Sequence, residues 1–262
     1  MKRNILILGL AMAGVCALPR PGFGQFAASV VAYERGTGFA SNFTNANAAL
    51  GAPASGSSVT PFAPPFSTSQ LVSIGAGGFL TLQLGTPITD DSSHPFGVDF
   101  LLFGNSFFVV TNGSGASATT SGSVFSTSVS TRVEVSQDNS TWYILDPAVT
   151  PTVGTYFPTD GPGNPLLPVN PALIASDFAG RNLSGIRSLY AGAAGGGDYD
   201  LEWARDGFGN PVVLDSVNYV RIDVLSGRTQ IDAIAAVPEP AAAALAMLAV
   251  TIMGFSRKRR RH

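Results

Sequence analysis

Short runs in which apolar and polar residues alternate recur through the middle of the chain. Residues 80–84 and 131–136 alternate, whereas residues 98–103 are almost continuously apolar. A period of two predicts a strand with one buried face, and a short apolar run before turn residues predicts a strand buried on both faces. No long helical period occurs between residues 26 and 237. The pattern therefore predicts an all-β domain, an antiparallel β-sandwich or jelly roll.

The segments between these runs predict turns and loops. Gln137 to Ser140 separates residues 131–136 from an apolar return at 142–145, which is typical of a hairpin. Residues 146–171 hold seven prolines, so a central strand is excluded there. Residues 111–123 are rich in Gly, Ser, Thr and Ala and predict a flexible excursion between strands. One short helix is expected within residues 172–178.

The N-terminus has the pattern of a secretory signal peptide. Lys2 and Arg3 precede an apolar run over residues 5–18. Cys16 raises the alternative of a lipoprotein signal, but Val15 stands where such signals need Gly or Ala. An uncleaved membrane anchor is a further alternative, although the run is shorter than the ~20 residues that span a bilayer. We expect residues 1–25 to be removed.

The C-terminus predicts a membrane helix with a cytoplasmic basic end. Residues 241–255 carry no charge, and we expect a transmembrane helix over about 240–256. The positive-inside rule places the basic tail in the cytoplasm and the domain of residues 26–236 outside. The basic tail, residues 257–261, consists of Arg257, Lys258, Arg259, Arg260 and Arg261.

A Pro-Glu-Pro motif precedes this helix. The motif residues are Val237, Pro238, Glu239 and Pro240, and with the short Ala/Leu/Met helix and terminal Arg cluster they resemble the PEP-CTERM sorting signal. The resemblance implies an exported protein of a polysaccharide-producing Gram-negative bacterium, processed within residues 237–262 by an exosortase. The inner membrane would then hold the chain only before processing. An ordinary tail anchor is the alternative.

Motifs within the domain carry a second resemblance. Residues 99–107, 133–143, 196–201, 219–222 and 231–237 resemble, in this order, motifs of bacterial cell-surface proteins with PEP-CTERM tails, and their fold is similar to galactose-binding-like jelly rolls. The resemblance implies a structural or adhesive, non-catalytic module of the cell envelope, cell surface or extracellular matrix, with polysaccharide or envelope components as partners. A secreted glycan-active hydrolase or lyase is the alternative.

Charge is distributed unevenly along the chain. Of the 15 basic residues, eight lie in the two terminal segments, and residues 26–237 keep seven Arg against sixteen acids, a net charge of −9. Nucleic-acid binding needs a basic face, so this composition excludes it for the domain. Cys16 is the single cysteine, which excludes a disulfide framework.

Histidine offers little for catalysis in this chain. His94 is the one histidine of the domain, and the chain has no Gly-x-Ser-x-Gly motif. A zinc site normally draws on Cys and His, and residues 26–237 offer one histidine and no cysteine. His94 lies in a polar stretch before Pro95, which we interpret as a solvated surface turn.

Carboxylates are the better candidates for chemistry. Thirteen of the sixteen acids of the domain are Asp, whose hard oxygens suit Ca²⁺. Asp198, Asp200 and Glu202 would share one face if this segment is extended. Asp99, Asp232 and the pair Asp90-Asp91 are further candidate ligands, and the alternative is that these acids cap turns and keep the surface soluble.

Two aromatic residues flank the acidic motif. Tyr199 and Trp203 could form a platform for a sugar ring, because their side chains combine an apolar face with a polar tip. Burial in the core is the alternative for both residues.

Overall fold

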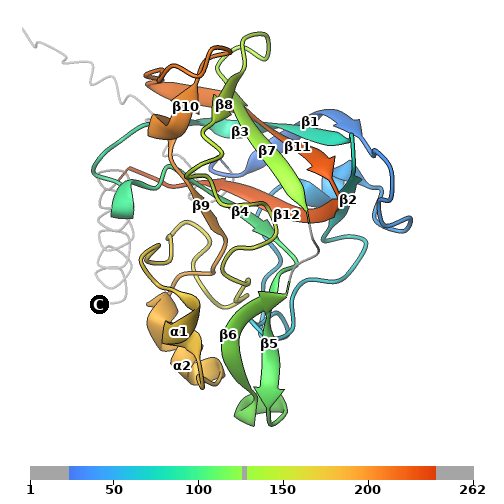
Figure 1. Ribbon diagram of the computed structural model, residues 1–262, viewed down its shortest axis with the longest axis vertical. Coiled ribbons are helices and arrows are strands. Elements are labelled where there is room, and N and C mark those ends of the chain that lie inside the picture. The colour runs from blue at the N-terminus through green and yellow to red at the C-terminus, as the bar shows by residue number, and fades with distance from the viewer. Residues whose placement is uncertain (1–23, 126–128, 240–262) are drawn as a thin grey trace, which may run out of the picture.

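A computed structural model describes residues 24–125 and 129–239 (Figure 1). The expected signal peptide, apart from Gly24 and Gln25, lies outside these ranges, as do Pro240, the expected helix that follows it and the basic tail. Within the two described ranges, no helix has the length and apolarity needed to cross a membrane.

The larger sheet has six strands in the order β1-β3-β11-β7-β8-β10, and every neighbouring pair is antiparallel. Its central strands β3 and β11 are long, which fits their alternating or β-branched sequences. The bounds are Ala27–Glu34 for β1, Phe79–Thr89 for β3, Ser130–Ser136 for β7, Tyr143–Leu145 for β8, Ala204–Arg205 for β10 and Ser216–Ser226 for β11.

The smaller sheet has four strands in the order β2-β12-β4-β9, again antiparallel throughout. Strands β5 and β6 form a separate antiparallel hairpin. The bounds are Val72–Gly75 for β2, Phe100–Gly104 for β4, Gly197–Tyr199 for β9, Arg228–Ala236 for β12, Phe107–Asn112 for β5 and Thr119–Phe125 for β6.

The two larger sheets pack face to face around one core. Leu82 and Val220 of the six-stranded sheet belong to the same buried cluster as Phe100 and Ile234 of the four-stranded sheet. Burial of such alternating side chains between two sheets is what stabilises a sandwich. The prediction of an all-β chain with antiparallel sheets is therefore confirmed.

The outer face of the small sheet is buried as well. Leu101 and Phe103 pack in a second cluster with Phe26 and Val237, which lie at the two ends of the domain. The amide of Ala236 also donates to the carbonyl of Gln25, so the ends meet. Burial on both faces explains why residues 98–103 show no alternation.

A lobe beside the sandwich contains the β5–β6 hairpin and helices α1 (Ala175–Phe178) and α2 (Leu183–Tyr190), drawn below the sandwich in Figure 1. Phe108, Phe178 and Tyr190 form part of its buried cluster. The expected flexible excursion at 111–123 is wrong, since most of it forms β5 and β6. The expected helix is limited to α1, and α2 was missed although Asn182 caps it by accepting from Gly185 N.

Short 3-10 helices complete the described elements. They are η1 (Ala46–Ala49), η2 (Pro95–Gly97), η3 (Gly115–Ser117) and η4 (Leu201–Trp203). The predicted hairpin is present as β7 and β8, in which Val135 pairs with Tyr143, and Asn139 has the positive φ of 61° that its turn requires.

Candidate functional site

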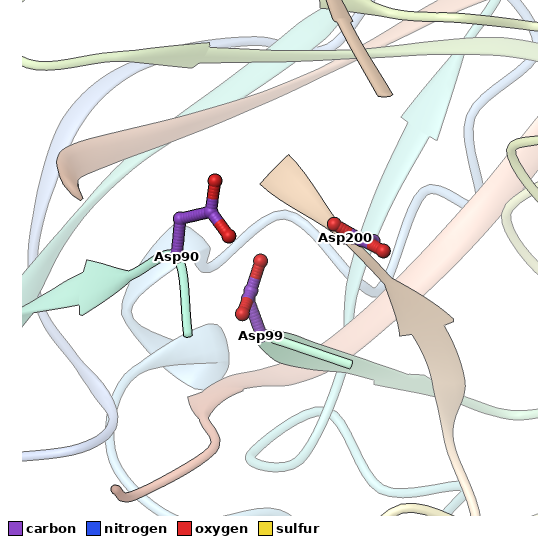
Figure 2. A group of neighbouring side chains, drawn as sticks. All are labelled: Asp90, Asp99 and Asp200. Atoms are coloured by element: carbon purple, nitrogen blue, oxygen red, sulfur yellow. The ribbon is translucent and has the colours of Figure 1, made fainter. Parts of the chain in front are cut away.

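Three aspartates meet at one end of the sandwich. Asp90 follows β3, Asp99 precedes β4 and Asp200 follows β9, and one oxygen of each lies within 4.8 Å of the others. Figure 2 shows their carboxyl groups around a common space. Pairing of β4 with β9 brings Asp99 and Asp200 together, because the amide of Asp99 donates to the carbonyl of Tyr199 at 2.9 Å, whereas the amide of Asp90 donates to the carbonyl of Asp215 at 3.1 Å. We call these residues the aspartate triad.

Asp99 is the buried member of the triad. Its Oδ2 accepts the backbone N–H of Leu201 at 2.8 Å, and its Oδ1 lies 2.8 Å from Nδ1 of His94. The side chain of His94 is itself fully buried, so the interpretation of this residue as a solvated surface turn is wrong. The 3-10 helix η2 turns His94 inward and leaves Phe96 exposed instead.

The triad places carboxylates where ionisation is costly. Burial raises the pKa of Asp99, and it also raises those of Asp90 and Asp200, with Glu202 adding repulsion at both. Neighbouring acids within this distance favour either a shared proton or a bound cation. Oxygen ligands of this kind suit Ca²⁺.

The other predicted ligands are not among the three aspartates whose oxygens converge. Strand β9 ends at Tyr199 and η4 begins at Leu201, so the extended alternation that would align Asp198, Asp200 and Glu202 stops at Asp200. Oδ1 of Asp200 caps the turn by accepting from Glu202 N, and Glu202 is exposed.

Asp232 is buried on β12 and serves a structural contact. Its Oδ2 accepts the backbone N–H of Ala54 at 2.9 Å, which ties a distant loop to the small sheet. Burial raises the pKa of Asp232 to about 7. Asp232 is not one of the three aspartates whose oxygens converge in the aspartate triad.

The two predicted glycan-contact residues have different positions. Tyr199 is fully buried, its ring stacks on Phe100 with centroids 5.0 Å apart, and its hydroxyl donates to the carbonyl of Pro151. It belongs to the sandwich core and presents no surface to a glycan. Trp203 is only half-buried and lines a cavity.

That cavity, of about 580 Å³, lies between the sandwich and the lobe. Its volume falls in the usual range of small-molecule sites. Most of its lining is apolar or aromatic: Phe108, Gly122, Ser123, Val124, Val149, Pro151, Thr155, Tyr156, Phe157, Pro171, Leu173, Ile174, Ala175, Phe178, Gly196, Gly197, Asp198 and Trp203.

Glycines allow the walls of the cavity to approach closely. A Cβ on Gly122 in β6 would lie 1.8 Å from the carbonyl oxygen of Ala175 in α1, and a Cβ on Gly197 would lie 2.6 Å from the ring of Tyr156. The glycine run before Asp198 admits the aromatic ring of Tyr156 beside β9.

Asp198 is the charged residue of this lining. It is 9% exposed, and its buried Oδ1 has no hydrogen-bond partner among the described residues. Burial raises its pKa to about 7. The cavity thus combines an unsatisfied acceptor with apolar and aromatic walls, including the half-exposed ring of Trp203.

Sequence reasoning missed most of this cavity. Phe108, Phe157 and Phe178 come from three separate segments, and nothing local in the sequence shows that they meet around Asp198. No protein-family model matches the chain, and no curated protein matches it either. The resemblances drawn from the motifs therefore stay predictions.

Proposed function

We propose that this protein is an exported, non-catalytic module of the cell surface or extracellular matrix that binds polysaccharide in the cavity beside Trp203. The observation that carries the proposal is the cavity itself, with Trp203 and Asp198 in one lining. A sugar ring has apolar C–H faces and polar hydroxyls, which match an aromatic wall and a carboxyl acceptor. The proposal includes that the β-sandwich of this domain is similar in fold to galactose-binding-like jelly rolls.

The lining favours binding over cleavage. Glycoside hydrolysis generally uses two carboxyl residues on either side of the scissile bond. Asp198 is the one acidic residue among those that line the described cavity. The aspartate triad is separate from that lining, so the two groups of acids are assigned different roles.

The position of the Pro-Glu-Pro motif supports export and sorting. Val237 is buried and its amide donates to the carbonyl of Asp99 at 2.8 Å, whereas Pro238 is half-buried and Glu239 is exposed. The motif thus begins at the buried end of the folded domain, and its Glu239 is exposed to a processing enzyme. We assign the chain as an exosortase substrate that reaches the envelope through a signal peptide and a temporary membrane helix.

Calcium is proposed as a structural ion at the aspartate triad. Asp90, Asp99 and Asp200 supply three carboxylates from the ends of three strands, and the burial that raises their pKa values would be offset by a divalent cation. The ion would join β3, β4 and β9 at one end of the sandwich.

Glycan binding and melting by the purified full chain, with and without Ca²⁺, test this function. We expect binding to a glycan panel, a loss of at least tenfold in Trp203→Leu, and little change in the control Trp142→Leu, since Trp142 lies outside the cavity lining. Chelation should lower Tm by about 5 °C, as expected for removing an ion present well above its Kd.

The double variant Asp90→Asn with Asp200→Asn should lose the melting response to chelator. Absence of binding to every glycan would contradict the binding role. An unchanged Tm on chelation would contradict the calcium site and leave the binding role to be judged by the two tryptophan variants.

A further inference from the structure

We infer that the glycan unit received by the cavity carries a free amine, and that its ammonium group lies against Asp198. The inference rests on the proposed glycan-binding function and specifies the chemistry of the sugar at that same cavity. It is carried by the position, burial and missing partner of this one carboxyl group.

Nine-tenths of Asp198 is buried, and its Oδ1 has no donor among the described residues. Asp160, another buried acid, instead receives two 2.8 Å hydrogen bonds from the guanidinium of Arg187. A buried acceptor without a donor is costly, so a ligand that supplies an N–H or O–H donor there gains affinity.

The charge of the cavity lining and of the whole domain also selects the ligand. Among the residues that the structure describes, the lining of the cavity contains no Lys, Arg or His, so none of these lining side chains neutralises Asp198. Residues 26–237 carry a net charge of −9. An anionic sugar would be repelled by this field, and a neutral sugar would leave the carboxylate without a counter-charge, whereas an ammonium group supplies both donor and charge.

The aromatic walls of the cavity also select the ligand. Phe157, Phe178 and Trp203 line the same cavity, and their rings suit both the apolar face of a sugar and a nearby cation. An apolar ligand would fill the cavity but would leave Asp198 unpaired. An amino sugar within a polysaccharide meets all three requirements.

The test compares two matched ligands with the purified full chain near neutral pH. Glucosamine oligosaccharides carry free amines, and N-acetylglucosamine oligosaccharides of the same length do not. By calorimetry we expect the amine form to bind at least tenfold more tightly. Asp198→Asn, which keeps the shape and removes the charge, should abolish that preference.

Asp232→Asn is the control, because Asp232 is a similarly buried acid outside the cavity lining. It should keep the preference for the amine form. Equal binding of both oligosaccharides, or a preference that survives Asp198→Asn, would overturn this inference and leave glycan binding intact. Failure of every glycan to bind would overturn the proposed function together with the inference.

Discussion

At the scale of single residues, burial controls the chemistry of the acids. Asp232 and Asp198 are both buried carboxyl residues, and burial raises the pKa of each to about 7. Asp138, in contrast, is exposed and accepts the amides of Ser140 and Thr141, which lowers its pKa. The residue type is the same, so the difference comes from solvent access and hydrogen-bond donors.

Asp232 should make stability depend on pH. Its pKa in the folded chain is about 7, above the ordinary value of 3.8, so the folded state holds a proton that the unfolded state loses first. This contribution is complete below about pH 4 and is lost as the pH rises through 7. The unfolding free energy of the original chain should fall between pH 4 and pH 8, and part of this fall comes from Asp232. In Asp232→Asn the fall should be smaller by about 3 kcal/mol, as measured by urea denaturation at the two pH values.

Asp215→Asn is the control for this measurement, because Asp215 is exposed. It should leave the pH dependence as in the original chain. If Asp232→Asn behaves like Asp215→Asn, burial of Asp232 does not contribute to the pH dependence of folding. Asp198 and Asp99 should retain part of the dependence in either variant, since burial raises their pKa values too.

At the scale of elements, close backbone approach joins helix α1 and the residues after it to strand β6 of the lobe. Gly122 in β6 has φ +88° and faces the carbonyl of Ala175 in α1. The amide of Gly180 donates to the carbonyl of Thr120, and the amide of Thr120 donates to the carbonyl of Arg181. Backbone hydrogen bonds therefore add to the shared buried cluster in holding the helical segment to β6.

Gly122→Ala should detach α1 from β6. The added Cβ would lie 1.8 Å from the carbonyl oxygen of Ala175, and the positive φ adds strain. We expect a loss of at least about 3 kcal/mol of unfolding free energy, measured by urea denaturation. Gly115→Ala is the matched control on the same hairpin, with φ +55° and no atom within 4 Å, and should cost about 1 kcal/mol. Equal losses would show that the contact with α1 is unimportant.

At the scale of the whole molecule, the two ends of the domain lie side by side in the small sheet. Phe26 bridges Ala235, and both belong to one buried cluster with Val237. The exposed Glu239 follows directly. The two ends of the described domain therefore lie in the same region of the sandwich, and the Pro-Glu-Pro motif begins at the buried Val237.

Glu239→Gln should change the fate of the chain in the producing bacterium. If an exosortase reads the motif, the variant should stay in the membrane fraction while the original chain reaches the surface or medium, as followed by fractionation and mass of the C-terminus. Glu34→Gln, an exposed acid at the end of β1, is the control and should be sorted normally. Normal processing of Glu239→Gln would contradict the sorting role and favour a simple anchor.

Local pattern predicted much of the fold and little of the site. Strands β3, β4, β7 and β11 follow from alternation or continuous apolar runs, which depend only on neighbouring residues. Asp90, Asp99 and Asp200 were all among the candidate ligands, but their convergence was not predicted. Tyr199, predicted as a possible glycan contact, lies in the core. The hairpin β5–β6 was missed because its Ser, Thr and Gly residues have the composition of a loop.

The sequence by itself determined the all-β class, the acidic character of the domain and the pattern of its two terminal segments, because each depends on composition or on residues close together in the chain. The tertiary structure alone decided which acids meet. Asp99 and Asp200 are 101 residues apart and come together through the pairing of β4 with β9. It also decided that His94 is buried and that Oδ1 of Asp198 has no donor within the described part of the chain, because burial and hydrogen bonding depend on segments that the local pattern does not connect.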